Sequence, residues 1–356
     1  MPGRRAARLL VLGAAVMLAA CAGAGSSGSP DRPAPAPSVP GWVLEQRVPL
    51  PAGGQATAVM GTGRYRTFGW RPTGGRADHQ VGVVDLRTGR STLLDALDPR
   101  ASTTGNWSDG RLMVRSEVVQ ADVPEAPVTW RLWQETLPPA TPVPLDASDG
   151  AVPLEGQPTV AITDRAVVWT KGVAACRCWR VMASRPGAAP ELLLQAPVGV
   201  VVKGDGHRVL VLAERAHVVD PASGRDVVLP VDRVATGALA GRRVVLFQPP
   251  TDRLGAGHGR LVLLDVPAGG VPRVVDTVEA PVGVGQVDFL DPGHVFLLLA
   301  DDAQPTRLLD LRTRALEAAP PVVDVSARYA LDGGTMTTVA GTPGHEELQV
   351  WHHMGA

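Results

Sequence analysis

The sequence has little net charge, few cysteines and no recognisable catalytic motif, and each shortage removes support for a class of function. The 356 residues carry a formal net charge of −1, so no overall field draws the chain to nucleic acid. Cys176 and Cys178 have no histidine nearby in the sequence, which leaves a zinc or copper site short of ligands. The sequence contains no G-x-S-x-G elbow, P-loop or H-E-x-x-H helix. Hydrolase and nucleotide-binding functions therefore have no support from motifs.

The first 20 residues have the pattern of an export signal. Three arginines precede an apolar run over residues 9–20, which is too short to span a bilayer that needs ~20 helical residues. The run ends in Leu-Ala-Ala-Cys21, which resembles the bacterial lipobox. In proteins with a lipobox, signal peptidase cleaves before the cysteine, and the thiol then carries a diacylglyceryl group. An ordinary secretory signal with an incidental cysteine is the alternative.

These features divide the chain into three parts. We expect residues 1–20 to be a lipoprotein signal peptide, residues 21–41 a disordered tether, and residues 42–356 a folded domain. The tether is rich in Ala, Gly, Ser and Pro and cannot bury apolar area. Two or more acyl chains on Cys21 would anchor the protein stably to the cell membrane, on its extracytoplasmic face.

An apolar-Asp hairpin recurs along the folded part with a fixed period. VVDLRTGRSTLL at residues 83–94 is matched almost position for position by VVDPASGRDVVL at 218–229. The aspartates of these hairpins and of two looser copies are Asp85, Asp220, Asp265 and Asp310. Their spacings of 135, 45 and 45 residues are multiples of 45. The period predicts seven repeats between Trp42 and the C-terminus.

Each repeat is expected to form four short strands, which we letter a to d. Apolar or alternating runs of four to eight residues are separated by Gly, Pro and Asp, and helical periodicity is scarce. The last repeat supplies strand a at 322–327, strand b at 334–341 and strand c at 348–353, but no strand d. We expect residues 42–50 to supply it by pairing with 348–353, which closes the ring.

The repeats resemble those of the YVTN-like and quinoprotein-like β-propellers of bacterial envelopes. The resemblance covers essentially the whole mature chain and implies an all-β fold, a seven-bladed β-propeller of four-stranded antiparallel blades. It implies no particular activity, because the fold hosts many. Quinoprotein dehydrogenases of similar fold use directly adjacent cysteines, whereas one residue separates Cys176 from Cys178. Lactonase-like propellers use several asparagines on an axial cation, and Asn106 is the only asparagine. We therefore expect no cofactor and no metal.

Cys176 and Cys178 lie in the connection between strands b and c of the third repeat. In an oxidising compartment, two surplus cysteines usually pair, so we expect a disulfide. The spacing is awkward, because residues i and i+2 of a regular strand lie near the upper Cα separation that a disulfide accepts. Free thiols, pairing with another chain and a metal site are the alternatives.

The eight histidines are scattered along the sequence without a metal-binding spacing. We expect them to be exposed or to cap turns. They are His79, His207, His217, His258, His294, His345, His352 and His353.

Long polar connections favour one face of the ring as a binding surface. In a propeller, the b–c and d–a connections share one face, here called the loop face, and the a–b and c–d turns share the other, here called the turn face. Several b–c connections are long, and loops on a rigid scaffold often carry function. The candidate binding residues on the loop face are Arg71, Arg76, Asp78, His79, Asp252, Arg253 and His258.

Two functional hypotheses follow from the sequence. The first is a lipid-anchored, extracytoplasmic propeller without catalytic activity, which binds a protein, peptide or glycan. The second is an enzyme with its site at the ring axis, either a hydrolase or a quinone- or metal-dependent oxidoreductase. Carboxylates or histidines gathered at the axis would favour the enzyme.

Overall fold

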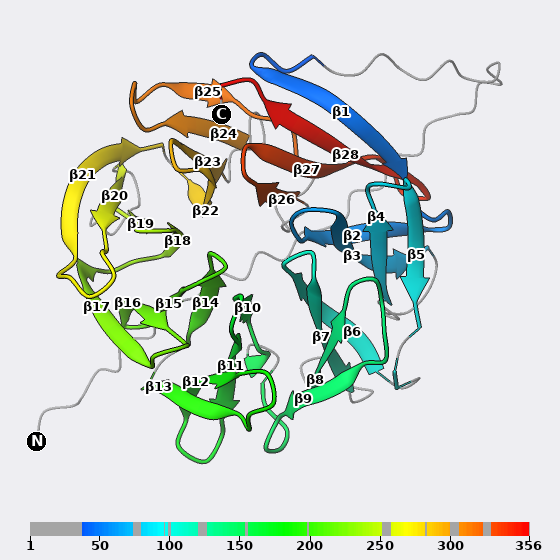
Figure 1. Cartoon of the computed structure of the whole chain (residues 1–356), viewed down its shortest axis with the longest axis horizontal. Coiled ribbons are helices and arrows are strands. Elements are labelled where there is room, and N and C mark those ends of the chain that lie inside the picture. Colours follow the sequence, from blue (N-terminus) through cyan, green and yellow to red (C-terminus); the bar gives the residue numbers. More distant parts are fainter. Residues whose placement is uncertain are drawn as a thin grey trace, which may run out of the picture. The chain divides into compact units, whose positions relative to one another are not determined.

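The chain folds as a ring of seven β-sheets, as the repeat predicts. The computed structural model describes residues 38–355 apart from 74–79, 96, 99–100, 120–126, 154–155, 198, 251–257, 282, 300–305 and 323–328. These residues form 28 strands in seven four-stranded sheets, arranged as blades around an axis (Figure 1). No helix among them is long and apolar enough to cross a membrane. Residues 1–37, which include the expected signal peptide, Cys21 and most of the expected tether, lie outside the described residues.

The first three blades follow one another in chain order, with strand a at the axis and strand d at the rim. Their strands are β2 (Gly54–Met60), β3 (Tyr65–Pro72), β4 (Gln80–Asp85) and β5 (Arg90–Leu94) in blade 1; β6 (Ala101–Ser108), β7 (Leu112–Val119), β8 (Thr129–Thr136) and β9 (Val143–Ala147) in blade 2; and β10 (Val160–Ile162), β11 (Val167–Val173), β12 (Cys178–Ser184) and β13 (Glu191–Ala196) in blade 3.

Blades 4 to 6 repeat the same order, and blade 7 combines both ends of the folded chain. Their strands are β14 (Val201–Gly204), β15 (Val209–Leu212), β16 (Arg215–Asp220) and β17 (Arg225–Asp232) in blade 4; β18 (Thr236–Ala240), β19 (Arg243–Gln248), β20 (Gly259–Asp265) and β21 (Arg273–Ala280) in blade 5; β22 (Val284–Asp291), β23 (His294–Leu299), β24 (Thr306–Asp310) and β25 (Leu316–Ala318) in blade 6; and β26 (Tyr329–Asp332), β27 (Thr335–Thr342), β28 (His345–His353) and β1 (Trp42–Pro49) in blade 7.

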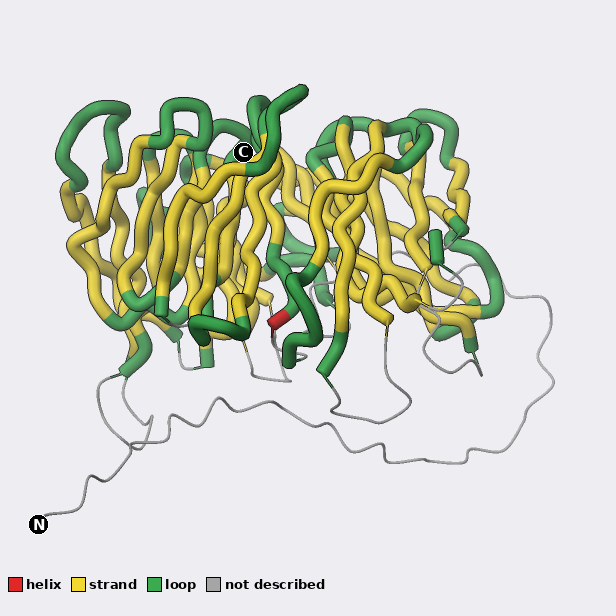
Figure 2. The backbone as a smooth tube through the Cα atoms, turned by 90° about the horizontal axis from the view of Figure 1, so that it is seen from below, coloured by secondary structure: helices red, strands yellow, loops and turns green. Residues whose placement is uncertain are grey.

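The place of a strand in its blade explains its sequence. The strands cross the thickness of the disc, and the connections gather at its two faces (Figure 2). Strand b is covered on both sides by neighbouring blades, and in β19 the apolar run from Val244 to Phe247 is buried throughout. Strand d is at the rim, where one side meets water, and most of β21 is exposed or half-buried. The hydrophobic cores accordingly lie between blades, as in the cluster that Leu210 and Leu229 of blade 4 share with Leu246 of blade 5.

The N-terminal strand closes the ring, which confirms the sequence prediction. β1 pairs antiparallel with β28, from Trp42 opposite His353 to Pro49 opposite Glu347, with an irregularity between Leu44 and Gln46. Val48 is fully buried and packs in the same core cluster as Leu348. Strands from the two ends of the folded chain thus complete the sheet of blade 7. The ring closes by the backbone hydrogen bonds between β1 and β28.

One strand of the last blade was predicted at the wrong place. Strand a was expected at 322–327, but the structure has it at β26, and residues 323–328 lie outside the described residues. The reason is the turn that follows. Gly333 and Gly334 have φ values of 53° and 88°, and Asp332 pairs directly with Thr335. A two-residue turn of this kind ties the strand to the residues immediately before it.

The repeated aspartate caps the turn between strands c and d. Asp85 accepts a hydrogen bond from the Arg87 backbone N–H at 3.0 Å, and Gly89 takes the expected positive φ, 64°. Asp310 accepts from the Arg312 backbone N–H at 2.7 Å and from the Thr313 hydroxyl at 2.7 Å. The aspartate that revealed the repeat is therefore a turn residue, on the turn face.

Candidate functional site

Of the seven residues predicted to bind on the loop face, only Arg71 and His258 lie among the described residues. Arg71 is exposed at the end of β3 in blade 1. His258 is exposed just before β20 in blade 5, where its Nδ1 lies 3.5 Å from Glu279 Oε1. These two blades are not neighbours in the ring. The other five residues lie outside the described residues: Arg76, Asp78, His79, Asp252 and Arg253.

Cys176 and Cys178 lie in the hairpin between β11 and β12. Their sulfur atoms are 1.96 Å apart and their Cα atoms 5.2 Å apart, and the structure joins them as a disulfide. Between them Arg177 has a φ of 50°, which takes the pair out of regular strand geometry and relieves the awkward spacing. Cys178 is buried and opens β12 opposite Val173. The bond closes a tight loop on the loop face of blade 3.

A charged bridge links two blades that are not adjacent, close to the ring axis. Lys203 on β14 of blade 4 places its Nζ 2.8 Å from Asp288 Oδ1 on β22 of blade 6, and 3.0 Å from the carbonyl of Val287. Blade 5, with β18 at the axis, lies between them (Figure 1). Both side chains are less than one quarter exposed. The bridge therefore braces the ring across an intervening blade.

The second oxygen of the Asp288 carboxylate is engaged as well. The Tyr329 hydroxyl donates to Asp288 Oδ2 at 2.6 Å, and Gln286 Nε2 donates to the same atom at 2.8 Å. Burial, reinforced by the Asp288 carboxylate, raises the pKa of Tyr329 well above its usual range. The phenol thus stays protonated and remains a donor. A carboxylate held by three donors is poorly placed to act as a base or nucleophile.

A cleft opens between blades 2 and 3 on the turn face. Its volume is about 590 Å³, within the range of about 300–1,000 Å³ usual for ligand sites. The walls come from the a–b and c–d turns of both blades. The lining residues include Arg111, Leu112, Val143, Pro144, Leu145, Arg165, Arg185 and Pro186.

The cleft combines apolar surface with charges that remain accessible. Val143 is 51% exposed although it belongs to a strand. Arg111 pairs with Asp109 and Arg165 with Asp164, and both arginine side chains are about 70% exposed. Exposed ion pairs of this kind are weakly held. Both arginines are therefore available to a ligand that lies in the cleft.

Two of the scattered histidines meet in the folded chain. His294 begins β23, His353 ends β28, and their ring centroids are 4.8 Å apart. Sequence spacing missed this pair, because the two residues lie in different blades and become neighbours only when the ring closes. The sequence carried only an indirect signal. In each repeat, strand b begins and strand c ends at the turn face, so a histidine at each of these positions lies on the same face of the ring.

Comparisons with known proteins identify the fold. No protein-family model matches the chain, and no curated protein matches it. The β-propeller domain of the Trilobed protease from Pyrococcus furiosus superposes with a TM-score of 0.58 at 10% identity, over 85% of this chain and 94% of that one.

Two further solved structures are similar at the same level. Oligogalacturonate lyase in complex with manganese has a TM-score of 0.56 at 12% identity, over 88% of this chain and 97% of that one. A prolyl endopeptidase has a TM-score of 0.57 at 14% identity, over 82% of this chain but only 45% of that one. Sequence identities this low show a shared architecture but not a shared activity. By sequence repeat, strand topology and similarity to solved structures, the chain is a seven-bladed β-propeller.

Proposed function

We propose that this protein is a lipid-anchored, extracytoplasmic binding module that takes an extended segment of a protein or peptide into the cleft between blades 2 and 3. The observation that carries the proposal is the cleft itself, with a volume of about 590 Å³. The lipid anchor and the location rest on the sequence around Cys21. The ligand class rests on what lines the cleft.

The chemistry of the cleft suits a chain with alternating apolar and charged groups. Val143, Pro144 and Leu145 give one wall an apolar surface, which would gain from covering by apolar side chains. Arg111 and Arg165 offer planar, multidentate donors that match carboxylates and backbone carbonyls. Because turns of two rigid blades form the walls, a ligand would meet a largely preformed site.

An enzyme acting at the ring axis is the weaker alternative. One carboxylate on an axial strand, Asp288, already accepts from Lys203, Tyr329 and Gln286. That arrangement fits a brace better than a reactive group.

The proposal is tested by selecting peptides against the purified full-length protein. A random peptide library is displayed on phage, and selected peptides are measured by calorimetry against the wild type and two variants. Arg165→Glu reverses a charge inside the cleft. Arg273→Glu makes the same change at the rim of blade 5, where Arg273 is 72% exposed.

We expect Arg165→Glu to weaken binding tenfold or more, equivalent to about 1.4 kcal/mol, and Arg273→Glu to leave it unchanged. Selected peptides that bind both variants as tightly as the wild type would place binding elsewhere. A glycan array run in parallel separates the ligand classes, since enrichment of glycans alone would contradict a peptide ligand.

A further inference from the structure

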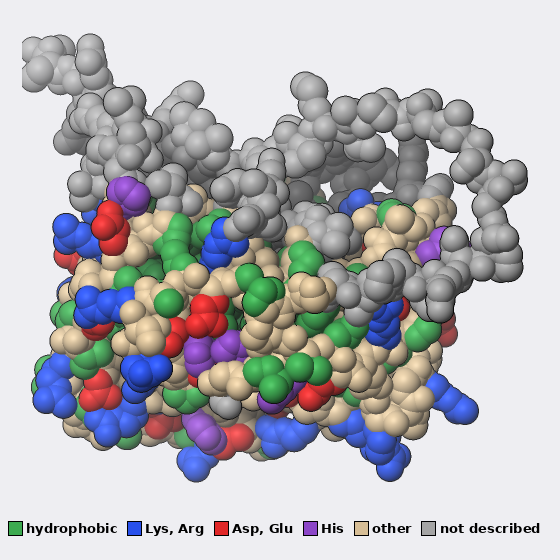
Figure 3. Space-filling view, turned by 90° about the horizontal axis from the view of Figure 1, so that it is seen from above, with side chains coloured by type: hydrophobic (Ala, Val, Ile, Leu, Met, Phe, Trp, Pro, Cys, Tyr) green, Lys and Arg blue, Asp and Glu red, His purple; other side chains and the backbone are tan. Residues whose placement is uncertain are grey.

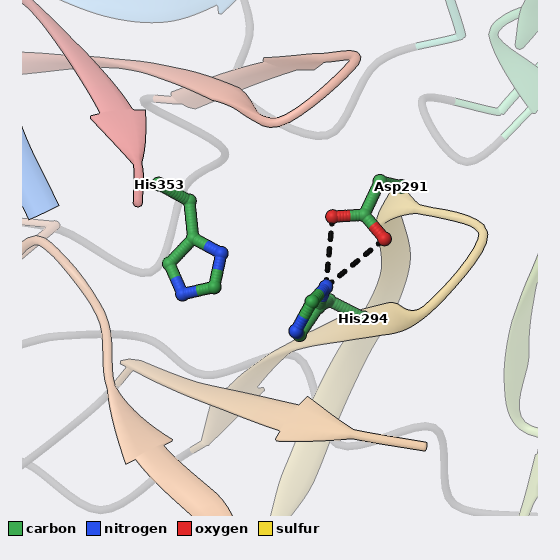
Figure 4. A group of neighbouring side chains, drawn as sticks. All are labelled: Asp291, His294 and His353. Carbon is green, nitrogen blue, oxygen red and sulfur yellow. Dashed lines mark hydrogen bonds and ion pairs between the residues drawn. The ribbon is translucent and has the colours of Figure 1, made fainter. Parts of the chain in front are cut away.

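The geometry points to a binding site for a divalent transition-metal ion, with zinc as the best fit, formed by Asp291, His294 and His353 where blade 6 meets blade 7. Asp291 and His294 are the two ends of the hairpin between β22 and β23, and His353 is the last residue of β28. Figure 4 shows the imidazole of His353 facing the other two side chains from the neighbouring blade.

The three side chains are close enough to share one ion. One ligand atom from each lies within 4.8 Å of the others, and the Asp291 carboxylate oxygens are 2.8 and 3.0 Å from His294 Nδ1. Tetrahedral zinc, with bonds of about 2.0–2.1 Å, places its ligand atoms roughly 3.3 Å apart. The ligand atoms therefore need to approach by no more than about 1.5 Å.

An unpartnered nitrogen supports a ligand at this point. The His353 side chain is only 4% exposed, and its Nδ1 is buried without a hydrogen-bond partner among the described residues. A buried polar atom left unpaired destabilises the folded state, because it has lost its hydrogen bonds to water. A metal ion bound to His353 Nδ1 would remove that destabilisation.

The other nitrogen of His353 favours the required tautomer. Its Nε2 lies 3.5 Å from Glu317 Oε2 on β25, so the carboxylate favours a proton on Nε2. The lone pair then remains on Nδ1, which faces Asp291 and His294. A carboxylate behind a histidine, with the metal in front, is a common way to orient a metal-binding imidazole.

The backbone holds the site firmly on both sides. The Gly293 N–H donates to Asp291 Oδ1 at 2.6 Å, which fixes the hairpin of blade 6. Two backbone bonds meet at Gly334: its N–H donates to Leu290 of blade 6 at 3.1 Å, and its carbonyl accepts from His353 at 2.9 Å. Ligands on strand ends tied together in this way keep their geometry better than ligands on loops.

The type of ligand selects the type of metal. Two imidazoles and one carboxylate suit zinc, nickel and copper, whereas calcium and magnesium prefer sites built from oxygen alone. Asp291 and His294 are each about one-seventh exposed, so an ion could enter from solvent. Seen from the side of β1 and β25, histidine side chains lie beside carboxylates on the surface of the ring (Figure 3).

Metal binding here would fasten the closure of the ring. His353 pairs with Trp42 of the closing strand, so an ion shared with blade 6 would connect the β22–β23 hairpin to the strand pair that joins the two ends of the folded chain. Binding to the folded state alone raises stability in proportion to the logarithm of metal concentration.

The test uses the full-length protein, prepared without a histidine tag and stripped with a chelator. Zinc chloride is titrated by calorimetry, and cobalt chloride is titrated while visible absorption reports tetrahedral coordination. His294→Gln and Asp291→Asn alter the site. His207→Gln is the matched control, because His207 also lies beside a carboxylate, Asp164 at 3.1 Å, but is 76% exposed on another blade.

We expect one zinc ion per chain, a cobalt spectrum of tetrahedral type, and a melting temperature that rises with zinc. Both site variants should weaken zinc binding at least tenfold and lose the cobalt spectrum, while His207→Gln retains both. Circular dichroism of the metal-free variants checks that they fold. The proposal is overturned if the wild type binds no stoichiometric zinc, or if folded site variants bind it as tightly as the wild type.

Discussion

The indole of Trp42 packs against the imidazole of His353, with ring centroids 4.9 Å apart, and the two residues face each other across β1 and β28. The Trp42 Nε1–H also donates to the Ala318 carbonyl of blade 6 at 3.1 Å. The start of the closing strand therefore contacts two blades at once. These contacts explain how the first strand of the folded domain stabilises the closed ring.

Removal of buried apolar contact from the closing strand should destabilise the whole ring. Val48 is fully buried, whereas Val43 in the same strand is 46% exposed. We expect Val48→Ala to lower the free energy of unfolding by about 2 kcal/mol, from the lost methyl groups and the cavity that they leave. Val43→Ala should change it by less than about 0.5 kcal/mol. Denaturant titration of both variants measures the difference, and equal losses would show that closure does not depend on this packing.

The bridge at the axis should show a measurable coupling. Loss of one partner leaves the other charge poorly compensated, so Lys203→Met and Asp288→Asn should each cost about 1–3 kcal/mol. The double variant should cost clearly less than the sum. The same cycle on the more exposed pair Arg314 and Asp276, whose nitrogen and oxygen are 3.1 Å apart, should give less than about 1 kcal/mol. Additive losses at Lys203 and Asp288 would argue against a brace.

The turn aspartates should make stability fall in acid. Bonds from the Thr313 hydroxyl and the Arg312 backbone N–H lower the pKa of Asp310 from 3.8 to about 2. A carboxyl with a lowered pKa contributes stability that is complete above its unfolded value and is lost as the pH falls through the folded value.

Asp310→Ala should therefore melt slightly below the wild type at pH 7, and the gap should narrow between about pH 4 and pH 2. Thr313→Val removes one donor to the carboxylate and should give a smaller gap at neutral pH. Melting curves across this range are the measurement. A gap that stays constant down to pH 2 would mean that the turn does not depend on the ionised carboxylate.

Lipidation is expected to depend on a single thiol. Cys21→Ser removes the sulfur that a lipobox modifies, so the variant should take up no labelled fatty acid in a bacterial host that processes lipoproteins. It should also move from the detergent phase to the aqueous phase on detergent partition. Cys176→Ser, which leaves Cys21 in place, is the control. A Cys21→Ser variant that still partitions with detergent would contradict the anchor.

The repeat itself determined the fold. The spacing of Asp85, Asp220, Asp265 and Asp310 predicted the number of blades, because each aspartate is the last residue of a strand c, which every blade has once. The missing strand in the last repeat predicted that residues 42–50 close the ring. One strand boundary was predicted wrongly: strand a of blade 7 was placed before its true position. The apolar run at 322–327 resembles a strand equally well, but the Gly333–Gly334 turn fixes the end of strand a at Asp332.

The sites were decided by tertiary structure. Lys203 and Asp288 form a bridge only because the curvature of the ring brings blades 4 and 6 near one another at the axis. The cleft is lined by turns of blades 2 and 3 that are far apart in the sequence and come together only in the folded ring. His294 and His353 meet because ring closure sets the end of β28 beside the hairpin of blade 6. A periodic sequence encodes each blade through local contacts, whereas contacts between blades depend on the angle and offset at which the blades pack, and no spacing along the chain records these.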